Sequence, residues 1–475
     1  MVERPLWTAQ EMIAATGGTL HGIIRGQMNN VSIDSRAIRA GDIFVAIKGD
    51  KMDGHDFVVS ALRSGAGVAV VAHVTDEMEA AGAVLQVADD PLRGLEHMGI
   101  AARAWSHARV IAVTGSVGKT STKEMLRLAL SASGQTHAST ASFNNHWGVP
   151  LTLARLPRQA AYGVFEIGMN HVGEITPLVK MVKPHVAIVT TVAASHLGNF
   201  SSLDEIASAK AEIFAGMAEN GAAIINRDNV YFAKLAAAAR ANGIRTIVGF
   251  GHHAAADVRL LRLALHPTCC CITADVMGET VTYKLGVPGE HMALNSLAVL
   301  AAVKLVGADL ARAMLALSDA APAKGRGVQE RLQLGHGEFL LIDESYNANP
   351  ASMRAGLALL ANAAVGKHGR RIAVLGDMLE LGRFGPALHA ELATALEEHK
   401  VDVLYASGPL MKQLWDATPP SKRGDYCESS AELGDILPEH FHNGDVVMVK
   451  GSLGSKMGLV VEALRAKFPA VKKDN

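Results

Sequence analysis

The chain has 475 residues, a length typical of about three domains, and its 45 lysines and arginines are balanced by 46 acidic residues. With no basic surplus and only 5% aromatic residues, the composition does not favour nucleic acid as a partner. The N-terminus lacks the apolar core of a signal peptide and no apolar run approaches a membrane span, so we expect a cytoplasmic protein without membrane insertion. The four cysteines have no C-x-x-C spacing, which favours neither a disulfide framework nor a zinc site.

The first block, residues 1–107, is predicted to be a small α/β domain. Short apolar segments at residues 42–47 and 67–71 are typical of strands, and glycine turns separate them from their neighbours. Residues 57–64 show a clear helical pattern.

The second block, residues 108–321, alternates strand and helix signals. The strand signals fall at residues 110–113, 163–167, 187–191 and 222–226. Such alternation predicts a mostly parallel sheet with crossover helices. Between residues 258 and 285 the pattern changes to three extended runs, which we expect to form a meander at one edge of that sheet.

The third block, residues 322–475, restarts the alternation. Its strand signals fall at residues 339–342, 372–375, 403–406 and 446–449, each followed by a helical stretch. This pattern predicts a Rossmann-like domain, but no G-x-G-x-x-G follows the first strand, so a dinucleotide is not indicated. The sequence as a whole therefore predicts an α/β protein of three domains.

The most informative motif is a glycine-rich turn between a strand and a helix at residues 110–124. Gly115 and Gly118 let backbone N–H groups approach anionic oxygens, Lys119 can reach terminal phosphates, and Thr120 can bind magnesium. The usual pattern has its first glycine where this chain has Val113, so the loop is short. The chain is predicted to bind a nucleoside triphosphate; the alternative is a tight turn with an exposed lysine.

Two polar residues follow strands of the central block. Glu166 ends one apolar strand, and His196 lies a few residues after another. Because ligands bind beyond the carboxyl ends of parallel strands, both are candidate magnesium ligands near the phosphate loop. The alternative for each is a solvated loop residue, and an imidazole is an unusual ligand for magnesium.

Two further features allow both an ordinary and a functional interpretation. Lys210 lies beside the apolar face of a helix that includes Ile206 and Ile213, a position typical of a surface lysine. A polar cluster, Asp343-Glu344-Ser345-Tyr346-Asn347-Ala348-Asn349-Pro350, follows the first strand of the third block. Such residues before a proline often form only a turn, yet this edge of the sheet is where a ligand is expected.

Together these motifs resemble the Mur ligase family over essentially the whole chain. The resemblance is carried by Asp34-Ser35-Arg36, the phosphate loop, Asn144-Asn145-His146-Trp147, the Glu166, His196 and Lys210 segments, Gly289-Glu290-His291 with Asn295, Gly325-Arg326, Asp343 with Tyr346-Asn347, Leu375-Gly376-Asp377-Met378-Leu379-Glu380-Leu381-Gly382, and Lys450-Gly451-Ser452. So many matches in one order argue against chance.

The resemblance implies an ATP-dependent amide ligase with an N-terminal UDP-binding domain, a central ATPase domain and a C-terminal Rossmann-like domain. It implies ATP and Mg²⁺ as cofactors and an acyl phosphate as the intermediate. The chain has no D-N-P-R segment, and residues 375–382 resemble the family member that joins D-alanyl-D-alanine to UDP-N-acetylmuramoyl-tripeptide. We therefore expect those two partners, a role in peptidoglycan precursor synthesis, and a monomer.

The resemblance also implies roles for individual residues. Catalysis is assigned to Lys119, Lys210, His196 and Glu166, with metal binding by Thr120, Glu166, His196 and Lys210 as a carbamate. ATP binding is assigned to Gly115, Ser116, Val117, Gly118, Lys119, Thr120, Ser121, His291, Asn295, Arg326, Asp343, Tyr346 and Asn347. Substrate binding is assigned to Ser35, Arg36, Asn144, Asn145, Lys450, Gly451 and Ser452.

Three alternatives stay open at this point. The chain could be another Mur-type amino-acid ligase, or a folylpolyglutamate-type ligase, whose loop ordinarily reads G-K-G-S where this chain has Gly118-Lys119-Thr120-Ser121. A third hypothesis, from a different class, is a binding module in which ATP only switches domain orientation. That module would release no product.

Overall fold

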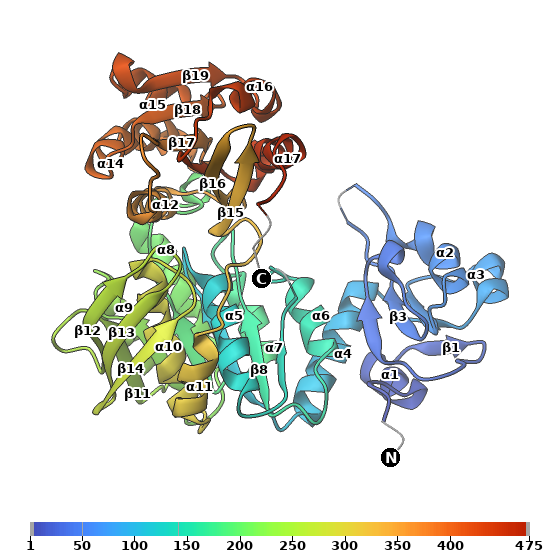
Figure 1. Ribbon diagram of the computed structural model, residues 1–475. Helices are drawn as coiled ribbons and strands as arrows, with labels where there is room; N and C mark the ends of the chain where they lie inside the picture. Colours follow the sequence, from blue (N-terminus) through green and yellow to red (C-terminus); the bar gives the residue numbers. More distant parts are fainter. Residues whose placement is uncertain (1–3, 50, 141, 472–475) are drawn as a thin grey trace.

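The computed structural model describes residues 4–49, 51–140 and 142–471, which form three units, each built on its own β-sheet. Figure 1 shows the N-terminal unit in blue beside the central unit, and the C-terminal unit in orange and red above the central one. The predicted α/β class is confirmed, with one sheet in each of the three predicted blocks.

The N-terminal unit has a five-stranded sheet of order β1-β5-β4-β3-β2, in which β1 is antiparallel to β5 and the other pairs are parallel. Its strands are β1 (Thr19–His21), β2 (Asn30–Ser32), β3 (Asp42–Val45), β4 (Val68–Val71) and β5 (Val84–Gln86). Its helices are α1 (Ala9–Thr16), α2 (Val58–Arg63), α3 (Asp76–Ala81) and α4 (Pro91–Trp105). The predicted helix at 57–64 corresponds to α2.

The central unit has a nine-stranded sheet of order β14-β13-β12-β11-β10-β9-β6-β8-β7. Its strands are β6 (Arg109–Thr114), β7 (Thr136–Ala138), β8 (Tyr162–Glu166), β9 (Val186–Val189), β10 (Ala222–Asn226), β11 (Thr246–Gly251), β12 (Val258–Leu265), β13 (Cys270–Val276) and β14 (Glu279–Leu285). Its helices are α5 (Lys119–Ser131), α6 (Gly148–Ala154), α7 (Ile175–Val182), α8 (Leu203–Ala211), α9 (Phe232–Ala241), α10 (Glu290–Leu305) and α11 (Leu310–Leu317). The predicted edge meander is confirmed, because β12, β13 and β14 pair antiparallel at one end of a parallel sheet.

The C-terminal unit has a six-stranded sheet of order β15-β16-β20-β17-β18-β19, parallel except for β15. Its strands are β15 (Val328–Leu334), β16 (Gly337–Glu344), β17 (Arg371–Gly376), β18 (Val403–Ser407), β19 (Arg423–Cys427) and β20 (Val446–Lys450). Its helices are α12 (Pro350–Asn362), α13 (Gly385–Ala390), α14 (Leu392–Glu398), α15 (Lys412–Ala417), α16 (Ser430–Ile436) and α17 (Gly458–Lys467).

Local sequence explains how the polar cluster after β16 begins a helix. The Asn349 side chain accepts a hydrogen bond from the Ser352 N–H at 2.9 Å, and Ser352 Oγ accepts one from the Asn349 N–H at 2.9 Å. Pro350 occupies the first helical position, where no N–H is needed. The predicted turn is therefore the N-terminal cap of α12, which starts at the carboxyl end of the sheet.

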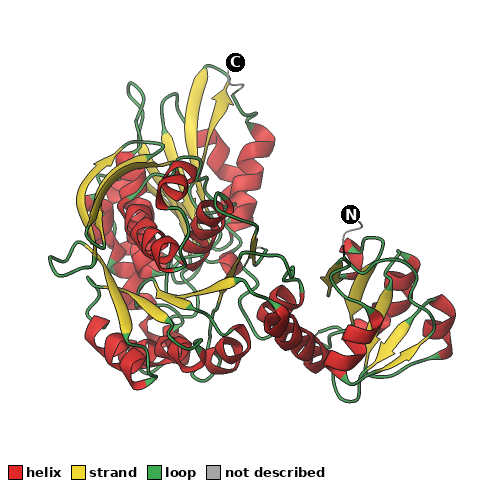
Figure 2. Ribbon diagram, turned by 90° about the horizontal axis from the view of Figure 1, so that it is seen from below, coloured by secondary structure: helices red, strands yellow, loops and turns green. Residues whose placement is uncertain are grey.

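Main-chain carbonyls join the N-terminal unit to the central one. Trp7 is fully buried, and its Nε1–H donates to the Ala154 carbonyl of α6 at 2.8 Å. Arg155 Nε donates to the Val31 carbonyl of β2 at 2.6 Å. Helix α4 packs against α6, and both views show helices where these units meet (Figure 1, Figure 2).

Arg103, near the end of α4, adds a further connection. Its Nε donates to the Val182 carbonyl at 2.7 Å and its Nη2 donates to the Lys183 carbonyl at 2.9 Å, so the guanidinium satisfies the last carbonyls of α7. Helix α4 is thereby fixed to two helices of the central unit.

No helix within the described ranges is long and apolar enough to cross a membrane. The four cysteines are free thiols, and Cys270 and Cys271 at the start of β13 are buried and exposed in turn, as alternation predicts. Burial raises the pKa of the Cys270 thiol to about 11, which suits a packing role.

We expect Trp7→Phe to loosen the N-terminal unit, because it leaves the buried Ala154 carbonyl without its donor, at a cost of roughly 1–3 kcal/mol. The measurement is hydrogen exchange in peptides from α1, β2 and α6, which should become roughly 10-fold to 100-fold faster. Trp415→Phe removes the equivalent indole donor to the Gly424 carbonyl in the C-terminal unit and is the matched control. Unchanged exchange in the N-terminal peptides would contradict the proposed interface.

Candidate functional site

The phosphate loop connects β6 to α5 through two glycines with positive φ. At Gly115, with φ of 148°, a Cβ would lie 1.9 Å from Thr190 Oγ1. At Gly118, with φ of 89°, a Cβ would lie 2.7 Å from Asn295 Nδ2. Only glycine therefore fits at either position, and α5 can start at Lys119 with its first N–H groups free of a side-chain cap.

Hydrogen bonds hold the loop against the segment that follows β9. Thr190 Oγ1 donates to the Val117 carbonyl at 2.6 Å, and the Ser116 N–H donates to the Thr191 carbonyl at 2.8 Å. Ser116 Oγ donates to the Ala193 carbonyl at 2.9 Å. The loop is thus rigid before any ligand arrives, which favours binding because less conformational entropy is lost.

Lys119 lies within this loop with its Nζ donating to the Gly115 carbonyl at 2.8 Å. Burial lowers the pKa of Lys119, the neighbouring Arg326 lowers it further, and Glu166 opposes both effects. An ammonium so placed gains most from anionic oxygens, which would replace the water that it has lost.

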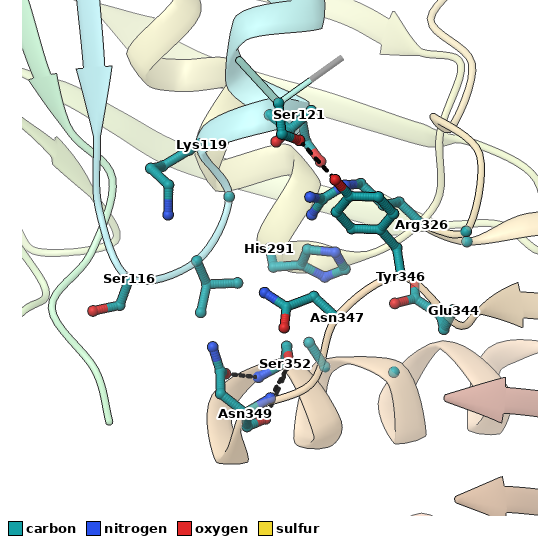
Figure 3. Close-up of a pocket in the computed structure, with 18 of the residues that line it drawn as sticks. Ser116, Lys119, Ser121, His291, Arg326, Glu344, Tyr346, Asn347, Asn349 and Ser352 are labelled. Carbon is teal, nitrogen blue, oxygen red and sulfur yellow. Dashed lines mark hydrogen bonds between the residues drawn. The ribbon is translucent and has the colours of Figure 1, made fainter. Parts of the chain in front are cut away.

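The loop faces a cleft of about 340 Å³ between the central and C-terminal units. Figure 3 shows Lys119 and Ser116 on one side, Asn347, Asn349 and Ser352 on another, and His291 near the middle of the view. The cleft is lined by fourteen of the predicted residues: Ser116, Val117, Gly118, Lys119, Thr120, Ser121, Asn144, Glu166, His196, His291, Arg326, Tyr346, Asn347 and Lys450.

Glu166 is the buried carboxylate of the cleft, with only 1% of its surface exposed. Asn144 Nδ2 donates to Glu166 Oε1 at 2.7 Å, which orients the carboxylate. Glu166 Oε2 is buried without a hydrogen-bond partner in the described structure. A buried oxygen of this kind requires a partner, and a divalent cation would supply one.

His196 of the central unit contacts Glu380 of the C-terminal unit. Its Nδ1 lies in contact with Glu380 Oε2, and this contact lowers the pKa of Glu380. His196 has φ of 56°, in the left-handed region that few residues other than glycine adopt. Of its two ring nitrogens, Nε2 is the one left to serve the cleft.

Lys210 is buried, with 2% of its surface exposed, so the interpretation as a surface lysine is wrong. Within the described ranges its Nζ pairs with no carboxylate. Burial lowers the pKa of Lys210 well below its usual value, and the charge of Lys119 lowers it further. The sequence pattern does not reveal the burial of Lys210. Helix α8 also packs on a second face, and no apolar pattern in the sequence distinguishes that face from a solvated one.

Aromatic and cationic side chains complete the cleft on the side of the C-terminal unit. The Arg326 guanidinium lies 4.5 Å from the centre of the Tyr346 ring, and Tyr346 Oη donates to Ser142 Oγ at 3.2 Å. Burial lowers the pKa of His291, which favours a neutral imidazole. These flat groups suit the face of a purine base or its ribose.

Lys450 lies at the end of β20 and is 1% exposed. Its Nζ donates to Glu344 Oε2 and to the Asn347 carbonyl, both at 2.9 Å. The lysine therefore holds the turn between β16 and α12 in place.

Seven predicted residues of the central and C-terminal units do not line the cleft: Gly115, Asn145, Lys210, Asn295, Asp343, Gly451 and Ser452. Asp343 instead accepts from Ser345 Oγ at 2.6 Å and pairs with Arg465 at 3.4 Å. Asn145 Oδ1 accepts from the Gly148 N–H at 2.9 Å, next to the start of α6. Ser35 and Arg36 belong to the N-terminal unit, where Arg36 is exposed and pairs with Asp34.

Sequence reasoning missed one face of α12. Four of its residues line the cleft at helical spacing: Ser352, Ala355, Gly356 and Leu359. Their spacing of three and four residues after a strand that ends at the ligand edge was the available signal. Glu344 lines the cleft, whereas the sequence predicts Asp343 there.

The residues present fit magnesium bound together with phosphate oxygens. Within the described ranges, no three His, Cys, Asp or Glu side chains gather into a metal site of their own. Magnesium usually takes one or two carboxylates and completes its shell with water and substrate phosphates. Glu166 with its free oxygen and the Thr120 hydroxyl at the start of α5 match this pattern.

Comparison with known proteins identifies the family of the chain. Family models match residues 27–130 (Mur ligase family, catalytic domain), 113–303 (Mur ligase middle domain) and 330–453 (Mur ligase, glutamate ligase domain).

Individual relatives match over nearly the full length. A UDP-N-acetylmuramoyl-tripeptide–D-alanyl-D-alanine ligase of Escherichia coli (strain K12) is 34% identical over 464 residues, 96% of this chain and 99% of the relative. A crystal structure of MurF from Acinetobacter baumannii gives a TM-score of 0.84 at 32% identity over 97% and 99% of the two chains. A Thermotoga maritima MurF ligase in complex with ADP gives 0.75 at 25% identity over 93% and 98%. The chain belongs to the Mur ligase family.

Proposed function

We propose that this chain joins D-alanyl-D-alanine to UDP-N-acetylmuramoyl-tripeptide at the expense of ATP, in peptidoglycan precursor synthesis. One observation carries the proposal. A hydrogen-bonded phosphate loop with a partly buried lysine and a buried carboxylate, one of whose oxygens has no partner, faces the polar edge of a second α/β unit across one cleft. The Escherichia coli relative named above carries this activity in its name.

The reaction follows from the chemistry of the substrates. A carboxylate oxygen of the tripeptide attacks the γ-phosphorus of ATP, the bond to the bridging oxygen breaks, and ADP leaves. The amine of D-alanyl-D-alanine then attacks the acyl carbon of the acyl phosphate, phosphate departs with the electron pair, and the amine loses a proton to solvent. Lys119 and the N–H groups at the start of α5 stabilise the negative charge on the transferred phosphoryl group.

Magnesium and Lys210 have linked roles in this proposal. Bound Mg²⁺ neutralises phosphate charge, and Thr120, Glu166 and His196 are proposed to hold it. The neutral amine of Lys210 attacks carbon dioxide and releases a proton, which leaves a carbamate with two oxygens in place of a cation. The lowered pKa of Lys210 supplies the neutral amine that this step requires.

We further propose domains at residues 1–107, 108–321 and 322–475, because each contains one complete sheet. The first would bind the UDP part of the substrate through Ser35 and Arg36. A single chain lines the whole cleft, so a second copy is not needed and the enzyme would act as a monomer. Its location would be the cytoplasm, where ATP is available.

The proposal is tested by phosphate release with each substrate pair in turn. We expect release only when UDP-N-acetylmuramoyl-tripeptide, D-alanyl-D-alanine, ATP and Mg²⁺ are all present, because the acyl phosphate needs both a carboxylate donor and an amine acceptor. Turnover with a UDP-muramoyl-dipeptide and a diamino acid would indicate another Mur-type ligase, and turnover with a folate and glutamate would indicate the folylpolyglutamate type. ATP binding without any product would indicate the binding module.

We expect Lys119→Ala to lower ligase activity by about 100-fold or more, because one charge stabiliser of the transition state is lost. Binding of the UDP substrate, measured by calorimetry, should stay close to wild type, since the proposed UDP site lies in another unit. Lys234→Ala removes a partly exposed lysine that pairs with Asp204 in the same unit and serves as the control. Activity of Lys119→Ala near that of the control would contradict the assignment.

We expect Lys210→Ala to lose most activity and acetate to restore part of it, because acetate can supply the missing oxygens. Wild-type protein incubated with ¹³C-bicarbonate should show a carbamate carbon signal that Lys210→Ala lacks. Lys119→Ala should not respond to acetate, which makes it the control. A wild-type protein that is active with magnesium but gives no carbamate signal would overturn this role.

A further inference from the structure

The central and C-terminal units meet at a joint beside the cleft. The short helix η3 (Leu197–Asn199) lies against η5 (Gly382–Phe384). The Gly198 N–H donates to the Glu380 carbonyl at 2.8 Å, and the Glu380 carboxylate pairs with His196 Nδ1. Both the backbone and the side chain of Glu380 therefore contact the segment that leads from β9 into the cleft.

Two glycines let the backbones approach at this joint. A Cβ at Gly382, where φ is 54°, would lie 2.8 Å from Gly198 Cα, and a Cβ at Gly198 would lie 3.1 Å from the Gly382 N. Glu380 itself has φ of 64°, a conformation that few residues other than glycine adopt. Backbone outliers of this kind gather at functional sites.

The loop that carries Glu380 is fixed on its own unit. The Met378 N–H donates to Nε2 of the fully buried His389 at 2.9 Å, and the Leu379 N–H donates to Ser452 Oγ at 2.9 Å. Asp377 accepts the Met411 N–H at 2.7 Å. The position of the Glu380 carboxylate is thus set by the C-terminal unit as a whole.

We propose that Glu380 of the C-terminal unit is a positioning residue for His196 of the central unit, at the cleft between these units. In the proposed role the carboxylate beside Nδ1 accepts its proton in a hydrogen bond, which fixes the ring and its tautomer and leaves the lone pair of Nε2 for the cleft. This ring is oriented only while the C-terminal unit rests on the central one. The catalytic consequence rests on the proposed function; the orientation of the ring does not.

A role in stability alone explains the pair poorly. The Glu380 side chain is 57% exposed, and exposed ion pairs contribute little to stability because water screens them. The backbone hydrogen bond between Gly198 and Glu380 would join the units whatever side chain stood at position 380. The Glu380 carboxylate therefore adds one thing to this bond: it sets the orientation and tautomer of the His196 imidazole.

The activity test compares Glu380→Ala, Glu380→Gln and the control Glu439→Ala, which breaks an exposed pair with Lys467 in the same unit. We expect Glu380→Ala to lower kcat by about 10-fold to 100-fold with an unchanged KM for the UDP substrate, the range found when the carboxylate behind a metal-binding histidine is removed. Glu380→Gln should keep part of the activity, because its carbonyl can still accept the Nδ1–H. A kcat for Glu380→Ala equal to that of Glu439→Ala would overturn the catalytic part.

The second readout needs neither substrate nor turnover. In protein labelled with ¹⁵N-histidine, the His196 signals are assigned by their loss in His196→Gln. We expect wild type to show His196 protonated at Nδ1, and Glu380→Ala to lose this preference while Glu439→Ala keeps it. A wild-type ring protonated at Nε2 alone would overturn the proposal. If the ring behaves as expected but no substrate pair is turned over, the positioning stands and the proposed ligase activity fails.

Discussion

The close approach of the phosphate loop to the segment after β9 is the constraint on which the site depends. Gly115 lies so near Thr190 that no side chain fits between them, and the Thr190 hydroxyl then bonds back to the Val117 carbonyl. The same segment continues to His196, so the loop and the candidate metal ligand share one rigid support. Lys119 is partly exposed there, with its Nζ held by the Gly115 carbonyl of the same loop.

The site is divided between two units that contribute different chemistry. The central unit supplies the phosphate loop and the buried Glu166, whereas the C-terminal unit supplies Tyr346, Asn347 and Lys450. One buried apolar cluster contains residues of both units, so their contact is more than a set of polar bonds. A cleft between two units can exclude water around the proposed acyl phosphate, although the two units that line it are separately folded.

The sequence predicts the strands that consist of continuous apolar runs. It does not predict which face of a strand or helix lines the cleft. Buried strands such as β10 and β20 were placed to within a residue or two, whereas β15 and β19, which lie at sheet edges and bury few side chains, gave no apolar run. At the end of β16 the sequence favoured Asp343, but Glu344 faces the cleft. Successive residues of a strand point to opposite faces, and the sequence alone does not tell which face is which.

The N-terminal junction has a consequence for how this chain tolerates change. Trp7, Arg103 and Arg155 all donate to main-chain carbonyls, at Ala154, Val182, Lys183 and Val31. Every amino acid offers a carbonyl, so the accepting positions can drift in evolution without losing the bond, provided that the backbone keeps its path. The donors have no such freedom, so these four bonds depend on one tryptophan and two arginines, beside the side-chain pair of Arg158 with Glu11.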